Sequence, residues 1–178
     1  MPNDTNTPTE PNWTFAIIAT GLAWLIPGAG HIYAGRTVRG IILLIVLGAT
    51  FWAGIAFGGV MTVDSRNERL WFYAQSLTGV HGMVSWYRQE QVYREIATEY
   101  EIPLDQIQPS PRPGPVEMEI DYALQQKKLA STEPAAGIAR TYTGIAGLLN
   151  LLCIFDILML CLMGQGKEPK PKPAEVTP

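Results

Sequence analysis

The chain of 178 residues is 47% apolar and only 16% charged, with a formal net charge of −3 at pH 7. Ordinary globular domains carry about 25% charged residues, so this composition argues against a soluble domain that is covered by water on all sides. The small net charge, without a basic stripe interleaved with aromatic residues, argues against a nucleic-acid partner.

The charged residues leave three long stretches nearly empty. Asp, Glu, Lys and Arg are absent from residues 11–35 and 40–63, and Asp156 alone interrupts residues 141–166. A helix that spans a bilayer needs about 20 such residues. The pattern predicts an all-α integral membrane protein, made of a helical hairpin, one or two further transmembrane helices and a partly helical extramembrane loop.

The first part of the chain predicts a tail and a hairpin. Residues 1–12 are polar, which is typical of a disordered tail, and they lack the basic stretch of a cleaved signal peptide. Residues 13–63 predict a transmembrane hairpin with helices at 13–33 and 38–63. Between them, the segment around Pro27 is expected to form a turn at a membrane face, because proline bends or ends a helix.

The middle of the chain is more polar. Residues 70–87 carry no formal charge if His81 is neutral, and aromatic residues at both ends favour a third transmembrane helix over an interfacial amphipathic one. Residues 88–135 predict a polar loop with short helices, interrupted by four prolines between positions 109 and 115. Residues 136–163 predict the final transmembrane helix, and residues 164–178 a disordered tail rich in Lys and Pro.

The distribution of Lys and Arg leaves two orientations open. With four spans, eight of the 13 basic residues lie on the side of the Pro27 turn and the 88–140 loop, which would then be cytoplasmic. With three spans, the turn shares its side with the C-terminal tail, the count becomes five against eight, and the orientation reverses.

The most specific pattern is the segment Leu-Ile-Pro-Gly-Ala-Gly-His-Ile-Tyr-Ala-Gly-Arg, from Leu25 to Arg36, with a glycine four residues further on. It resembles the TM-two-type domain, a family of two-transmembrane-helix proteins. The matching positions are Pro27, Gly28, Gly30, His31, Tyr33, Gly35, Arg36 and Gly40. Residues 141–152, with Asp156 after them, are similar to the final helix of longer bacterial members of unknown function. The resemblance implies a helical hairpin in a bacterial inner membrane and implies no reaction.

Two polar residues interrupt the last apolar stretch. An acid such as Asp156 is costly inside a membrane and indicates a function or an ion pair. Its candidate partners are Arg36, Arg39 or His31, or else Arg66 or Arg69, depending on which membrane face its end of the helix reaches; contact with headgroups and water is the alternative. Asn150 is expected to form a hydrogen bond between helices.

No Ser-His-Asp set, Walker loop, zinc-ligand spacing or carboxylate pair is present, so the sequence predicts no catalytic, cofactor-binding or metal-binding residue and no enzyme. The favoured interpretation is a small multi-pass membrane protein that acts as a non-enzymatic scaffold or accessory subunit. Its expected partners are the lipid bilayer and a membrane protein or a second copy of the chain. The alternative is a small transporter or permeation subunit lined by polar residues such as Asp156, Asn150, His31 and Gln75.

Overall fold

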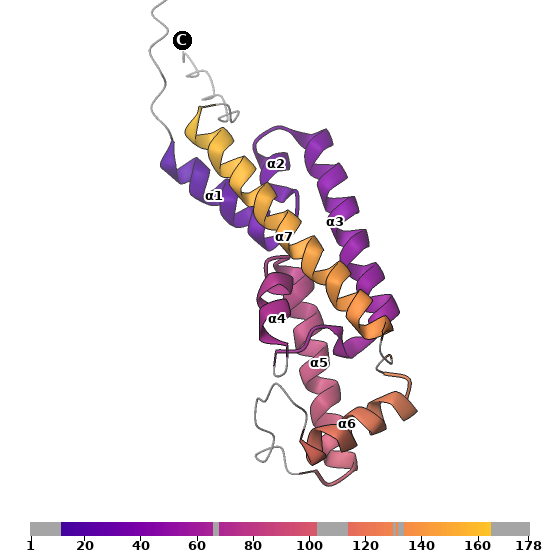
Figure 1. Cartoon of the computed structure of the whole chain (residues 1–178). Coiled ribbons are helices and arrows are strands. Elements are labelled where there is room, and N and C mark those ends of the chain that lie inside the picture. Colours follow the sequence, from indigo (N-terminus) through magenta and orange to yellow (C-terminus); the bar gives the residue numbers. More distant parts are fainter. Residues whose placement is uncertain (1–11, 66–67, 103–113, 130, 132–133, 165–178) are drawn as a thin grey trace, which may run out of the picture.

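The computed structural model describes residues 12–65, 68–102, 114–129, 131 and 134–164 (Figure 1). Within these residues all regular structure is helical: seven α-helices and one short 3-10 helix, η1 (Val60–Thr62). The all-helical class predicted from the sequence is therefore confirmed. Both expected tails lie outside the described residues, apart from Asn12 and Gly164.

Two long helices run side by side through the molecule (Figure 1). They are α3 (Thr37–Gly58) and α7 (Ala135–Leu162), and among the described residues these two are long and apolar enough to cross a membrane. Small residues allow their close contact: a Cβ atom at Gly54 would lie 2.7 Å from Thr143 Cγ2. Only 22% and 33% of their most apolar windows are buried, so most residues in these windows are at least partly exposed.

The single helix expected at 13–33 is a hairpin instead. Helix α1 (Trp13–Leu25) begins at Asn12, whose side-chain oxygen accepts from Phe15 N at 3.1 Å. The chain then reverses at Pro27 and Gly28, and the short helix α2 (Ala29–Tyr33) returns along α1. Proline supplies no N–H to continue α1, and Gly28 has φ +84°, which favours glycine. At 13 residues α1 is about 20 Å long, against about 33 Å for α3.

The helix expected at 70–87 is also broken. Helix α4 (Arg69–Ser76) is followed by Leu77 as its cap, and α5 (Val80–Glu99) begins after Gly79, which has φ +62°. Thr78 supports the break because its hydroxyl donates to the Gln75 carbonyl at 2.6 Å. Neither α4 nor the apolar start of α5 is long enough to span a bilayer.

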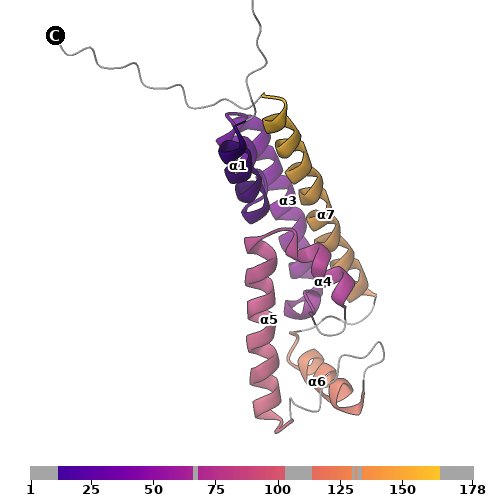
Figure 2. The same ribbon diagram turned by 90° about the vertical axis from the view of Figure 1, so that its left-hand side faces the viewer.

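The two interrupted segments, α1–α2 (residues 13–33) and α4–α5 (residues 69–99), meet at the points where their helices break. A Cβ atom at Gly79 would lie 2.2 Å from the Trp24 carbonyl oxygen, so the start of α5 touches the end of α1. His81 lies beside Gly48, which is halfway along α3. Figure 2 shows α1 and α5 one after the other beside α3 and α7. Helix α1 and the first half of α5 thus together occupy the place of a third long helix, with the negative end of α1 facing the positive end of α5.

The far half of α5 extends beyond α3 and α7 and packs with α6 (Pro115–Gln126), as Figure 2 shows. These two helices share a separate apolar core formed by Tyr93, Ile96, Ala97, Ile102, Ile120, Ala123 and Leu124. Lys127 donates to Glu99 across the pair, and this hydrogen bond raises the pKa of Lys127. The polar region expected at 88–135 is therefore largely a two-helix unit in its described part.

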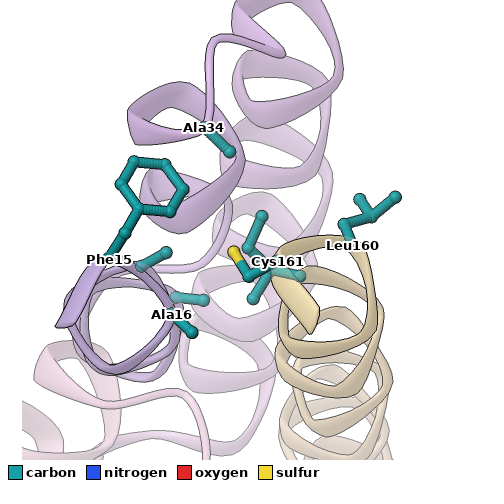
Figure 3. Close-up of a cluster of buried hydrophobic side chains, with 8 residues drawn as sticks. Phe15, Ala16, Ala34, Leu160 and Cys161 are labelled. Atoms are coloured by element: carbon teal, nitrogen blue, oxygen red, sulfur yellow. The ribbon is translucent and has the colours of Figure 1, made fainter. Parts of the chain in front are cut away.

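The other end of the molecule has its own core. The last turns of α7 pack on the α1–α2 hairpin, with Phe15 and Ala16 of α1 near Leu160 and Cys161 of α7 (Figure 3). Ala34, at the end of α2, closes the same cluster. Because α7 also packs on α3 and α4, it joins three helices, α1, α3 and α4, by extensive contact, and it touches α2 more lightly. The middle and end of α7 are accordingly where the polar contacts described next are found.

Candidate functional site

Asp156, near the end of α7, contacts one residue of α2 and one residue of α3. His31 Nε2 on α2 lies 2.8 Å from Asp156 Oδ2, and Arg39 Nη2 on α3 lies 3.2 Å from the same oxygen. His31 is fully buried, whereas the side chains of Asp156 and Arg39 are 34% and 51% exposed. The structure thus brings together two of the partners that the sequence offered for Asp156.

The glycines around Pro27 explain how His31 reaches this position. A Cβ atom at Gly28 would lie 2.1 Å from the Gly40 carbonyl oxygen, and one at Gly30 would lie 2.3 Å from the Ala19 carbonyl oxygen. These contacts hold α2 tightly between α1 and α3, which leaves His31 facing α7. The turn expected at a membrane face is therefore a return helix packed inside the bundle, because its glycines approach the backbones of both neighbours.

Two further residues of the segment from Leu25 to Arg36 shape the end of α2 and the start of α3. Tyr33 stacks on Phe15 of α1, with ring centroids 4.9 Å apart. Gly35 has φ +79° and turns the chain toward Arg36, the residue that precedes α3. The segment thus supplies an aromatic contact to α1 and a left-handed residue before α3. Each of these two residues has a structural role in the observed fold.

The chemistry available at Asp156 is that of a shared carboxylate. One of its oxygens faces an imidazole and a guanidinium, and His31 Nδ1 is buried without a hydrogen-bond partner among the described residues. A carboxylate that accepts from two cationic or polar donors is a strong cross-link between helices. Among the described residues no group of three or more His, Cys, Asp and Glu side chains could hold a metal ion.

Asn150, in the middle of α7, contacts the ends of two other helices. Its Nδ2 donates to the Ala23 carbonyl at 3.1 Å and to the Leu77 carbonyl at 2.8 Å. In a continuous helix the Ala23 carbonyl would accept from the residue four positions on, but that residue is Pro27, which has no N–H. The Asn150 amide replaces the missing donor at the end of α1. The same amide also holds the end of α4.

A second buried amide lies on α4 itself. Gln75 Nε2 donates to the Thr62 carbonyl at 3.0 Å and to Thr143 Oγ1 at 2.8 Å. The adjoining backbones are in direct contact, since a Cβ atom at Gly147 would lie 1.8 Å from the Ala74 carbonyl oxygen. Sequence reasoning noted Gln75 only as a polar residue and missed this α4–α7 contact. The signal was the pair of glycines Gly144 and Gly147, because a Cβ atom at Gly144 would also lie 2.4 Å from Trp71 of α4.

Comparison with known proteins assigns the chain to a family. A model of a protein family of unknown function, DUF6677, matches residues 18–169. The chain belongs to this family. No curated protein and no solved structure matches it. The matched range of the DUF6677 family includes both interrupted segments as well as Asn150 and Asp156. The family match does not name the TM-two-type domain, so that resemblance stays a prediction.

A double-mutant cycle separates the two contacts of Asp156 in this DUF6677 protein. The coupling between His31→Leu and Asp156→Asn is expected to be about 1–2 kcal/mol, because the imidazole is buried and its bond to the carboxylate is charge-assisted. The coupling between Arg39→Gln and Asp156→Asn is expected at about 0.2–1 kcal/mol, because both groups are partly exposed. Unfolding in detergent measures both values. A larger coupling for the Arg39 pair would contradict this account of the site.

Proposed function

We propose that this protein is an integral membrane scaffold or accessory subunit without enzymatic activity. The observation that carries the proposal is that the buried side-chain amides donate to the protein's own backbone. Asn150 and Gln75 donate to backbone carbonyls that end or flank α1, α4 and η1. Side chains occupied in this way hold a fold together and are not free to bind a substrate with the same donors.

The outward surface of α3 and α7 supports the membrane location. Large apolar side chains are exposed along both helices, among them Ile41, Ile42, Ile45, Leu152, Phe155 and Met159. Soluble monomers rarely expose a continuous apolar surface of this kind. The proposal places α3 and α7 across the bilayer, and the resemblance to bacterial membrane proteins suggests the bacterial inner membrane.

In this arrangement the two interrupted segments enter the bilayer from opposite faces. The α1–α2 hairpin enters beside the start of α3, and the α4–α5 hairpin enters beside the start of α7; both end near the middle. Counted over the whole sequence, five Lys and Arg residues then lie on the side of Arg36 and eight on the side of α5 and α6. The excess of Lys and Arg on the side of α5 and α6 favours a cytoplasmic location for these two helices.

Membrane integration is tested by extracting native membranes with alkaline carbonate. The protein is expected to stay in the pellet, because two apolar helices cannot be removed by breaking ionic contacts. A soluble domain fused to the same epitope tag serves as the control and should be released. Release of this protein into the supernatant would refute an integral location.

The scaffold role predicts that α6 faces a partner protein or a second copy. A photo-crosslinking residue at Tyr122, which is 65% exposed on α6, is expected to give discrete larger species in native membranes. The matched control is Leu152, which is 62% exposed on α7 and is expected to face lipid. If the protein is strictly monomeric in detergent and forms no crosslink in its membrane, the scaffold role loses its support.

Transport is the second candidate, and one observation favours it. Transporters often place binding sites where membrane helices are interrupted near mid-depth, and α1 and α4 both end beside Asn150. This candidate requires a proton- or ion-dependent flux in vesicles that Asp156→Asn abolishes. Absence of flux with the unmodified protein would eliminate it.

A further inference from the structure

Helix α5 changes character along its length. Its first two turns expose apolar side chains, including Val80, Met83 and Val84, and the polar sequence begins at Arg88. Trp86 and Tyr87 lie at the change and are 40% and 60% exposed. Aromatic residues at such a boundary are typical of the membrane–water interface. In the proposed membrane arrangement, α5 leaves the hydrocarbon layer here.

A cavity of about 620 Å³, about half open to solvent, lies at the same level of the helix. Its lining residues are Ser65, Trp86, Tyr87, Glu90, Gln91 and Arg94. Trp86 Nε1 donates to Ser65 Oγ at 3.2 Å, so the ring surface of the indole, and not its N–H, is what remains for a ligand. The volume is in the usual range for small-ligand sites.

The cavity carries one charge of each sign at one level. Arg94 reaches back one turn of α5, and its Nε lies 3.2 Å from Glu90 Oε1. The Glu90 side chain is 20% exposed and the Arg94 side chain 69% exposed. Because the Arg94 side chain is mostly exposed, this ion pair is weak, and a ligand with complementary charges can contact both groups. The aromatic rings add a surface that attracts cations.

We propose that this cavity binds a phospholipid headgroup with a primary ammonium and a phosphodiester, as in phosphatidylethanolamine. The ammonium donates to Glu90 against the rings of Trp86 and Tyr87, and the phosphate pairs with Arg94. The acyl chains follow the exposed apolar side chains of the first turns of α5. Glu90 disfavours an anionic headgroup, and a choline group has no N–H to donate to it. The inference rests on the proposed membrane location.

Native mass spectrometry of the full-length protein in detergent tests this site. Short-chain phosphatidylethanolamine, phosphatidylcholine and phosphatidylglycerol with identical acyl chains are added in turn. The ethanolamine lipid is expected to be retained best. The double variant Glu90→Gln, Arg94→Gln should bind it about tenfold more weakly, since it loses charge-assisted contacts. The matched control Arg88→Gln removes an exposed charge that does not line the cavity and should bind as the unmodified protein does.

Equal retention of the three lipids, or unchanged binding by the double variant, would overturn the inference. Soluble glycerophosphoethanolamine distinguishes the two sources of the headgroup. If it binds as tightly as the lipid, the ligand is a free phosphoester and the lipid assignment is wrong. Carbonate extraction of the same variants reports membrane integration separately, so loss of the lipid site alone leaves the proposed location intact.

Discussion

Replacement of Asn150 by leucine is expected to lower the free energy of unfolding by about 2–4 kcal/mol. The side chain donates to the Ala23 and Leu77 carbonyls, which belong to separate helices. Without the Asn150 amide, the Ala23 carbonyl would remain buried without a donor, because Pro27, four residues further on, has no N–H. The ends of α1 and α4 would then lose their common attachment to α7.

Thermal unfolding in detergent, followed by circular dichroism, measures this effect. Leu152→Ala, at an exposed position of α7, is the matched control and should change stability little. Asn150→Asp gives a sharper comparison, because its carboxylate cannot donate and places a negative charge beside two helix C-termini. It should be at least as destabilising as leucine. Unchanged stability in both variants would show that the amide does not hold the two helix ends.

The second large effect is expected for Gly28→Ala, at about 3 kcal/mol of lost stability. The backbone at Gly28 has φ +84°, a conformation that alanine adopts at a cost. Its Cβ would also lie 2.1 Å from the Gly40 carbonyl oxygen and 3.0 Å from Leu44 N. Both neighbours are backbone atoms of α3, so α2 must move away from α3 to make room.

Gly21→Ala is the matched control for this substitution. Gly21 lies in the middle of α1, and a Cβ atom there would meet nothing within 4 Å. Alanine at an open helical position is expected to stabilise the protein by about 0.5–1 kcal/mol. The same unfolding measurement compares the two variants. Equal effects at positions 21 and 28 would contradict the proposed packing of the return helix.

The long helices could be predicted closely from the sequence because their apolar stretches are continuous. The expected ranges 38–63 and 136–163 compare with α3 at Thr37–Gly58 and α7 at Ala135–Leu162. The interrupted segments could not be predicted in this way. Hydropathy is averaged along the chain, so a reversal inside an apolar stretch leaves it unchanged. Pro27 indicated one break, whereas Gly79 resembles any glycine of a membrane helix.

The polar contacts were predictable only in part. Asp156 indicated a partner on general grounds, and His31 and Arg39 were among the candidates. The choice depended on which end of the bundle α7 reaches, which the charge distribution left open. The acceptors for Asn150 are backbone carbonyls, and these have no signature in the sequence. Such contacts are found only when the ends of the helices have been placed in space.

In the proposed arrangement, α3 and α7 cross the membrane and the α1–α2 and α4–α5 hairpins enter it from opposite faces. Cysteine-accessibility mapping at positions 5, 66, 110 and 172 tests this arrangement directly, after Cys153 and Cys161 have been replaced by alanine. A membrane-impermeant maleimide is applied to intact and to permeabilised cells. We expect positions 5 and 172 to be labelled from one side of the membrane and positions 66 and 110 from the other. Labelling of position 66 on the same side as position 5 would contradict the arrangement, since α3 would then not separate the two.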